Sequence, residues 1–456
     1  MSHSISIPGS GILFCVCVSI ILIFSSADIV SAQKAWTLEE CITYALEHNI
    51  SVKQSELNTE LADVNYDQSK AAFLPSLNGS AGYTYNFGRS ADPFTNLYTE
   101  QEVQSSNFST NSNLPIFYGF QIMNGLSQSK YEYLASNENL AKIKNDISLN
   151  VAAAYLQVLY SKENLKAVND RLEAARQNRD RTKLMVDAGS MAQGNLLDAE
   201  AALATEELAK VNADNQLTTA FISITQLLEL KSMVGFDVAD PAVEIPEQSA
   251  LTMSADEIYK TALNTLPEFR ASEWNIKSAE KSLSVSKGAR FPRLSLTGGM
   301  STGTSNIARL FTGELKPFND QMADNYNKYV GLSLSVPLFN GWSTESSIKR
   351  SKINLENVRY TDQLTKNSVY KSVVQAHADA TAALQKFYAS QKAATSTNEA
   401  FVYAEKKYNV GMLSSIEFLN VRNNKSKAES DFLQAKYDFI FRLKVLDFYL
   451  GKSLAF

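Results

Sequence analysis

The feature that most constrains this chain is a duplicated spacing between a proline and a glycine. Gly189 lies 74 positions after Pro115, and Gly411 lies 74 positions after Pro337. No proline interrupts either interval, and glycine is almost absent beyond the opening turn. Each interval therefore predicts one continuous helix, over 118–187 and 340–409, of about 70 residues and roughly 100 Å at 1.5 Å per residue.

The duplication extends beyond these two helices. Leu74-Pro75-Ser76-Leu77 recurs as Phe291-Pro292-Arg293-Leu294 at an offset of 217 positions, and from the second strand of each half onward the offset is 222. The chain therefore divides into a first repeat over 33–230 and a second repeat over 254–456. The stretch 231–253 contains one glycine and two prolines and is expected to be an irregular linker.

Strand patterns follow each of these helix-to-strand junctions. Apolar residues alternate with Asn, Ser, Thr and Gly, which predicts β-hairpins over 76–117 and 293–339 with one apolar and one polar face. Polar loops are expected at 88–105 and 304–327. The clearest alternation sets Val330, Leu332, Leu334, Val336 and Leu338 against Gly331, Ser333, Ser335 and Pro337.

Four strands of about ten residues have the length that a membrane strand needs, but four cannot close a barrel. Because unpaired strand edges are not tolerated in lipid, a membrane location requires several chains to share one barrel, and three chains would supply twelve strands. Two alternatives stay open. The hairpins could pack on a soluble core, or the helices could form a fibrous coiled coil without a channel.

Shorter helices accompany the two long ones. One helix is expected over 37–73, starting at Thr37 with acidic residues in its first turn, and another from Ser254 to Arg290. Return helices are expected over 195–230 and 414–450. The first long helix carries a heptad seam, which is typical of coiled coils. The seam consists of Ile147, Val151, Ala154, Val158, Ser161, Leu165, Val168, Leu172 and Ala175.

The N-terminus predicts a signal peptide over 1–32. The apolar run from Ile12 to Phe24 is too short to span a bilayer as a helix, and Val30-Ser31-Ala32 is a small-residue cleavage site. An N-terminal membrane anchor is the alternative. Cys15 and Cys17 would leave with the signal peptide, and no lipid anchor is expected. The mature chain would keep only Cys41, which excludes an intramolecular disulfide.

Composition offers no support for nucleic-acid binding or for an enzyme. The chain has 43 basic and 48 acidic residues and a formal net charge of −5, whereas a nucleic-acid binder needs a basic surface. His48 and His377 have no Cys or carboxylate at zinc-like spacing. We expect no catalytic residue, no metal and no cofactor.

Three sets of residues carry a resemblance to a known family. They are Leu/Val-Pro-Ile/Leu-Phe-x-Gly at 114–119 and 336–341, the two helix-to-strand junctions, and the sequence from Tyr408 to Asn420. In this order and spacing, the chain resembles the TolC-like outer membrane efflux proteins over nearly all of its mature length. The resemblance implies a mainly α fold with β. It implies a homotrimer with a twelve-stranded outer-membrane β-barrel, four strands per chain, continued by a long α-helical coiled-coil barrel.

The resemblance also implies two protein partners. A periplasmic adaptor (membrane fusion) protein would dock at the helical tips, and an inner-membrane transporter would supply the energy. The expected function is the outer-membrane duct of a tripartite efflux system, which passively exports small molecules. The outlet of a type I protein secretion system and a non-channel periplasmic coiled-coil scaffold remain alternatives. The expected location is the lipid bilayer of the outer membrane, with a long periplasmic extension and no nucleic acid.

Candidate functional residues lie where the long helices reverse. Gly189 and Gly411 would adopt the positive φ that such turns need, although simple helix termination also explains them. Apolar side chains near the turns would either bind an adaptor or pack the coiled coil. They are Leu184, Ala188, Leu196 and Leu197 in the first repeat and Val410, Met412, Phe418 and Leu419 in the second.

In the family that the chain resembles, a tyrosine, an arginine and two acidic positions in the second tip help to close the pore. Tyr408 matches the tyrosine and Glu417 the first acid, but Leu413 replaces the arginine and Asn420 the second acid. Asp198 is the first-repeat counterpart of Asn420. We expect these residues, Leu413 excepted, to form the pore constriction, where Glu417 would favour cations. A solvated acid at a helix end is the alternative for Glu417.

Overall fold

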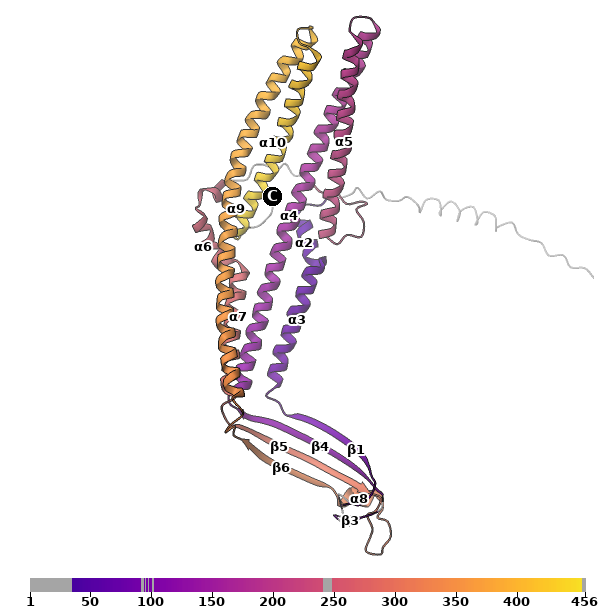
Figure 1. Ribbon diagram of the computed structural model, residues 1–456, viewed down its shortest axis with the longest axis vertical. Coiled ribbons are helices and arrows are strands. Elements are labelled where there is room, and N and C mark those ends of the chain that lie inside the picture. Colours follow the sequence, from indigo (N-terminus) through magenta and orange to yellow (C-terminus); the bar gives the residue numbers. More distant parts are fainter. Residues whose placement is uncertain are drawn as a thin grey trace, which may run out of the picture. The chain divides into compact units, whose positions relative to one another are not determined.

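The computed structural model describes residues 35–91, 94, 96, 98–100, 102–240 and 248–452 (Figure 1). The expected signal peptide and part of the linker lie outside these residues. The chain forms two compact units. The first comprises the described parts of Met1–Tyr44 and Val151–Glu244, and the second those of Ala45–Asn150 and Ile245–Leu454. Among the described residues, no helix combines the length and the apolar character needed to cross a bilayer.

The two long helices predicted from the repeat are confirmed. Helix α4 runs from Gln121 to Asp187 and α9 from Ser343 to Asn409, and each has 67 residues without a break. Each is followed by a return helix of 35 residues, α5 over Gln193–Leu227 and α10 over Ser415–Tyr449. Within the single chain, most of the predicted heptad seam of α4 is buried, and only Ala154 and Leu165 are partly exposed.

The prediction of one helix over 37–73, and of one from Ser254 to Arg290, is wrong. Helix α2 (Leu38–His48) ends before Asn49, and α3 (Ile50–Ala71) begins after it. Asn49 is extended and its side chain accepts a hydrogen bond from the Ser51 backbone, which is the N-cap role that asparagine favours over a helix interior.

The second repeat breaks at the equivalent residue, Leu266, between α6 (Ala255–Thr265) and α7 (Pro267–Gly288). Here the cause is Pro267, because proline disfavours helical dihedrals in the residue before it. The two breaks are 217 positions apart and are therefore equivalent in the two repeats. The first is made by the Asn49 cap and the second by Pro267.

The second unit contains one antiparallel sheet of four strands. They are β1 (Ser76–Asn86), β4 (Val103–Tyr118), β5 (Arg293–Ser305) and β6 (Asn327–Ser335), and their order in the sheet is β1-β4-β5-β6. A small hairpin of β2 (Ser90–Ala91) and β3 (Tyr98–Thr99) lies in the first loop. Helix α8 (Phe318–Asp324) lies within the stretch 304–327, for which a polar loop was expected. Among the described strands, β1 pairs only with β4 and β6 only with β5, so each has one free edge in this part of the chain.

The strand register gives this sheet one apolar and one polar face. Tyr83 pairs with Ser106, Thr110 with Met300 and Leu296 with Leu332. The even-numbered positions of β5, of β6 and of β4 up to its bulge at 115–117 therefore share a face with the odd-numbered positions of β1. That face carries the large apolar side chains of the sheet, most of them exposed in the single chain. They are Leu77, Tyr83, Tyr85, Phe108, Leu114, Leu294, Leu296, Met300, Val330, Leu332 and Leu334.

In the first unit, α4 contacts the start of the linker through hydrogen bonds and an ion pair. The Tyr155 hydroxyl donates hydrogen bonds to the backbone oxygens of Ala239, at 2.7 Å, and Trp36, at 3.3 Å. Trp36 also forms a parallel β-bridge with Val238. Lys162 forms an ion pair with Asp237 and donates to the Val238 carbonyl. These contacts pin the described start of the linker to the N-terminal segment and to α4.

Candidate functional site

The turn between each long helix and its return helix is built in the same way in both repeats. Gly189 has φ +69° and Gly411 has φ +77°, and an added Cβ would meet no atom within 4 Å at either position. Glycine is therefore favoured here because of the positive φ, and not because a larger side chain would clash with its neighbours. The amide of Ser190 donates to the Met185 carbonyl, and the equivalent amide of Met412 donates to Lys407, each at 2.9 Å. These bonds satisfy carbonyls at the helix ends.

The structure separates the apolar residues near the turns into two groups. Leu196 and Phe418 are buried and pack the coiled coils. Leu184, Leu197, Val410 and Met412 are exposed, as are Ala188 and Ile416, whereas Leu419 is partly exposed. The exposed group is available to another molecule, whereas Leu196 and Phe418 are not.

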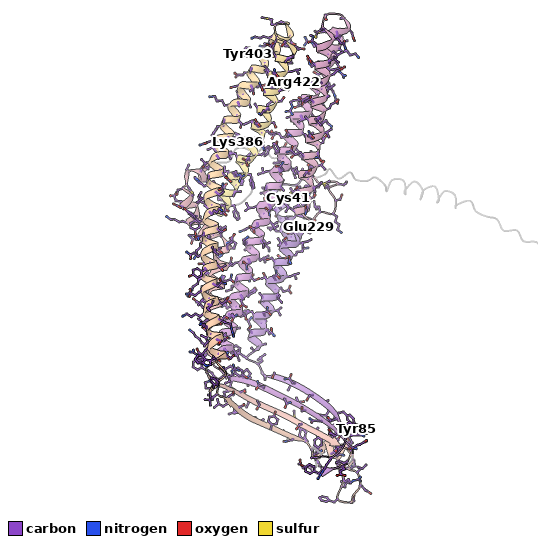
Figure 2. The ribbon with its side chains drawn as sticks, in the orientation of Figure 1. Cys41, Tyr85, Glu229, Lys386, Tyr403 and Arg422 are labelled. Atoms are coloured by element: carbon purple, nitrogen blue, oxygen red, sulfur yellow. The ribbon has the colours of Figure 1, made fainter. Side chains whose placement is uncertain are left out.

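Tyr408 belongs to an aromatic cluster inside the second tip. Its ring stacks on Phe418 with centroids 4.5 Å apart and an interplanar angle of 6°. Phe418 also contacts Phe401, over which the Lys425 ammonium lies at 4.5 Å. Figure 2 shows Tyr403 and Arg422 in the same part of α9 and α10. This cluster could not be found from the sequence, because the aromatic positions are brought together only when α10 packs on α9.

Glu417 caps helix α10. Its carboxylate accepts hydrogen bonds from the Ser414 backbone at 3.0 Å and from the Ser414 hydroxyl at 2.8 Å, while the Ser414 hydroxyl accepts from the Glu417 amide. This is a capping box. The bonds from Ser414, first from its hydroxyl and then from its backbone, lower the pKa of Glu417. The Ser-x-x-Glu spacing could have revealed this arrangement from the sequence.

The remaining predicted constriction residues lie on the return helices. Asn420 is exposed on α10 in the second unit, and Asp198 is partly exposed on α5 in the first unit. Leu413 is partly exposed just before α10. Within one chain, Tyr408 and Glu417 thus lie in the same tip. There Tyr408 stacks on Phe418, and Glu417 is hydrogen-bonded to Ser414.

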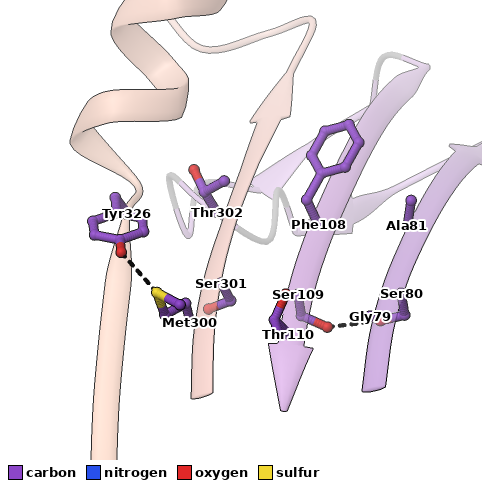
Figure 3. Close-up of a pocket in the computed structure, with 10 residues that line it drawn as sticks. All are labelled: Gly79, Ser80, Ala81, Phe108, Ser109, Thr110, Met300, Ser301, Thr302 and Tyr326. Atoms are coloured by element: carbon purple, nitrogen blue, oxygen red, sulfur yellow. Dashed lines mark hydrogen bonds between the residues drawn. The ribbon is translucent and has the colours of Figure 1, made fainter. Parts of the chain in front are cut away.

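The polar face of the sheet is a second feature with functional potential. It carries Asn78, Ser80, Ser109, Asn111, Thr297, Ser301, Tyr329 and Ser333. The Ser80 and Ser109 hydroxyls form a hydrogen bond of 2.7 Å, which is the dashed line between them in Figure 3. The Tyr329 hydroxyl donates a hydrogen bond of 3.1 Å to Asn111.

Two glycines of β5 make room on this polar face. A Cβ at Gly299 would lie 2.8 Å from the Tyr329 ring, and one at Gly303 would lie 2.1 Å from the Phe94 ring. Close packing therefore explains these glycines. Within the described residues, no group of three or more His, Cys, Asp or Glu could hold a metal ion.

Comparison with known proteins places this architecture in one family. The family model for outer membrane efflux proteins matches the chain twice, over residues 41–229 and 258–452, in agreement with the two repeats. The outer membrane efflux protein BepC of Brucella suis biovar 1 is 23% identical over 424 residues, which cover 91% of this chain and 86% of BepC. The alkaline protease secretion protein AprF of Pseudomonas aeruginosa is 22% identical, with 84% of this chain and 77% of AprF covered.

A solved structure agrees with the fold. The CmeC outer membrane channel of Campylobacter jejuni superposes with a TM-score of 0.79 at 17% sequence identity, covering 91% of this chain and 85% of CmeC. The chain therefore belongs to the outer membrane efflux protein family, and it is an outer-membrane efflux channel of the TolC-like type.

Proposed function

We propose that three copies of this chain close one twelve-stranded barrel and form the duct of a tripartite efflux system that exports small molecules. The observation that carries the proposal is the four-stranded sheet with two unpaired edges, one apolar face and one polar face. Such a sheet satisfies its backbone in lipid only when its edges pair with further strands. The apolar face then contacts lipid, and the Asn, Ser and Thr side chains line water.

The test is conductance together with stoichiometry. Purified protein added to a planar lipid bilayer should give stable single-channel currents, and its mass in detergent should equal three chains. A protein that fractionates as soluble and conducts nothing would support the periplasmic scaffold instead.

The exposed apolar residues of the tips support docking of a periplasmic adaptor that connects to an inner-membrane transporter. Leu184, Val410 and Met412 are 71%, 69% and 75% exposed in the chain, in or near the two turns. Val410→Ser with Met412→Ser should reduce co-purification of the adaptor without changing conductance. Leu208→Ser, also at an exposed position but within α5, is the matched control. Equal loss in both variants would contradict docking at the tip.

Glu417 can act at the constriction through its charge or only as a cap, and two substitutions separate these roles. Glu417→Gln removes the charge and keeps a residue type that suits a capping box. Ser414→Ala removes the hydroxyl of the cap and keeps the charge. If Glu417 lines the pore, cation selectivity in single-channel recordings falls in Glu417→Gln and persists in Ser414→Ala. Unchanged cation selectivity in Glu417→Gln would show that Glu417 caps the helix and does not line the pore.

Protein secretion is a second candidate, because AprF is named for secretion of an alkaline protease and aligns with most of this chain. The sheet and the tips serve either substrate class in the same way. Which transporter co-purifies with the protein separates the two candidates. A proton-driven drug pump would favour efflux, and an ABC transporter encoded beside a large exported protein would favour secretion.

A further inference from the structure

The two repeats of one chain meet at a joint made by α4 of the first repeat and α7 of the second, here called the internal joint. The Tyr131 and Trp274 rings stack with centroids 5.7 Å apart and an angle of 12°. Arg270 forms an ion pair with Glu138 at 3.0 Å. The pairs run in opposite directions along the two helices, so the internal joint is an antiparallel helix contact.

The internal joint continues into the sheet. Gly119 and Gly288 approach so closely that a Cβ on either would lie within 2.5 Å of the carbonyl oxygen of the other. The Phe120 ring packs edge-on against Phe291. Beyond these residues, β4 pairs with β5. One continuous contact therefore joins the first repeat to the second through helices, junction and strands.

The repeat offsets found in the sequence hold for contacts in the structure. Within the first repeat, the Ser69 and Ser129 hydroxyls are 2.7 Å apart. Their counterparts in the second repeat, Ser286 and Ser351, are 2.8 Å apart. The offsets are 217 for the residues on α3 and α7 and 222 for those on α4 and α9. The same offsets can therefore convert each contact of the internal joint into its counterpart.

The counterparts of the internal joint are α9 and α3, and both carry an unpartnered apolar stripe. Tyr131 converts to Ile353 and Trp274 to Leu57, which are 61% and 65% exposed in the single chain. The exposed stripe of α3 consists of Ile50, Leu57, Leu61 and Val64, and that of α9 consists of Ile353, Tyr360 and Leu364. Each stripe has heptad-like spacing, which is typical of a helix face that packs on another helix.

We propose that the α9 stripe of one copy packs against the α3 stripe of a neighbouring copy in the register of the internal joint. Ile353 then meets Leu57 of the neighbouring copy, and Trp342, the counterpart of Phe120, meets Leu74, the counterpart of Phe291. This intermolecular seam rests on the proposed sharing of one barrel, and it adds which residues meet and in what register.

The strand edges agree with the same register. In the internal joint Asn113 pairs with Thr297 and Thr110 pairs with Met300. The offsets convert these pairs to Ser335 with Ser80 and to Leu332 with Tyr83, across the free edges of β6 and β1. Ser335 and Ser80 both belong to the polar face, and Leu332 and Tyr83 both belong to the apolar face. A register shifted by one residue would place apolar side chains on the polar face.

The intermolecular seam differs in chemistry from the internal joint. The ion pair of Arg270 with Glu138 converts to Lys53 with Tyr360, and the stacked aromatic pair converts to Leu57 with Ile353. The Gly119–Gly288 approach converts to Gly341 with Ala71, so a methyl group stands between the two backbones. The seam between copies is therefore more apolar than the internal joint, and its two backbones lie farther apart at the junction.

The experiment links cysteines with a short bifunctional thiol reagent in the mature protein, from which Cys15 and Cys17 have been removed with the signal peptide. Leu57→Cys with Ile353→Cys tests the seam, and Ser80→Cys with Ser335→Cys tests the strand register independently. Leu57→Cys with Leu364→Cys is the out-of-register control, because eleven helical residues displace the second thiol by about 16 Å. Tyr131→Cys with Trp274→Cys reports the internal joint. The native Cys41 is buried, and burial raises the pKa of its thiol to about 12, so it does not compete.

The expected result is covalent dimers and trimers on a denaturing gel for the two seam pairs, single chains for the out-of-register pair, and linkage without a gain in mass for Tyr131→Cys with Trp274→Cys. Equal intermolecular linkage of the in-register and out-of-register pairs would overturn the register. If the internal pair links, the protein conducts and neither seam pair links, the seam is wrong while the channel stands. A protein that stays monomeric and conducts nothing overturns both the seam and the shared barrel.

Discussion

Removing one partner of the Arg171–Glu206 ion pair should destabilise the first coiled coil more than removing both partners. The pair joins α4 to α5 with 3.4 Å between Arg171 Nε and Glu206 Oε2, and the Glu206 side chain is only 10% exposed. At an effective dielectric constant of 20, two unit charges at this distance attract by about 5 kcal/mol. Desolvation of both charges offsets most of this attraction, so the net contribution of the intact pair is small.

Each single variant leaves one charged side chain without its ionic partner. Arg171→Ala leaves the buried Glu206 carboxylate without its ionic partner, and we expect a loss of about 2 kcal/mol. That value lies below the 3–5 kcal/mol typical of fully buried pairs, because the Arg171 side chain is 21% exposed. Arg171→Ala with Glu206→Ala should lose less than about 1 kcal/mol. The second repeat already has alanine at both equivalent positions, Ala393 in α9 and Ala428 in α10, and Ala428 is buried. An alanine pair is therefore compatible with this coiled-coil packing.

Hydrogen exchange followed by mass spectrometry measures this effect locally. A change of 2 kcal/mol in the opening free energy corresponds to about 30-fold faster exchange, since 1.4 kcal/mol is tenfold. Peptides that cover 165–210 should show it in Arg171→Ala and recover most of their protection in the double variant. The reasoning is refuted if the two single effects add in the double variant, or if peptides from α9 and α10 change equally.

Three further predictions follow from local geometry. Gly189→Ala should destabilise the first tip by about 1–2 kcal/mol because of its positive φ, whereas Gly125→Ala, inside α4 with open space around it, should stabilise its helix by about 0.5–1 kcal/mol; exchange in the peptides around each site measures both. The Cys41 thiol should resist alkylation at pH 8 in the folded protein and react after denaturation, because it is buried and its pKa is about 12; rapid labelling of the native protein, detected by mass, would contradict this. Hydrogen bonds from the Ser254 backbone and then its hydroxyl lower the pKa of Glu257, so its capping contribution is present above the ordinary pKa of a glutamate and is lost as pH falls below roughly 4; exchange at the start of α6, corrected for intrinsic rates, should show this loss in the native protein and not in Glu257→Gln.

Much of the fold could be predicted from the sequence, because the constraints were long-range and repeated. The uninterrupted intervals from Pro115 to Gly189 and from Pro337 to Gly411 leave a helix as the only regular structure of that length. The alternation in β6 determines which side chains share a face. The helix break at Asn49 was missed, since Asn49 is a single polar residue in a helical pattern and its capping role depends on the local backbone. The break at Leu266 could have been predicted, because Pro267 disfavours helical dihedrals in the residue before it.

The candidate site was less predictable. Family resemblance predicted a pore role for Tyr408 and Glu417. Within one chain, the structure shows that Tyr408 stacks on Phe418 and that Glu417 forms a capping box with Ser414. The partner of Tyr408 is ten positions away on the next helix, and helical periodicity does not reveal which side chains meet across a turn. The exposed stripes of α3 and α9 could not be predicted from the sequence either, because exposure depends on which helix faces other elements cover.

A sheet that presents one free edge on each side also restricts how assembly can fail. Every chain carries its four strands as a unit, so a ring can gain or lose strands only four at a time. Rings of two, three or four chains would have eight, twelve or sixteen strands, and no intermediate circumference exists. A miscounted ring would therefore not be a slightly altered channel. It would appear as a separate conductance level, distinct from the main one by a whole step.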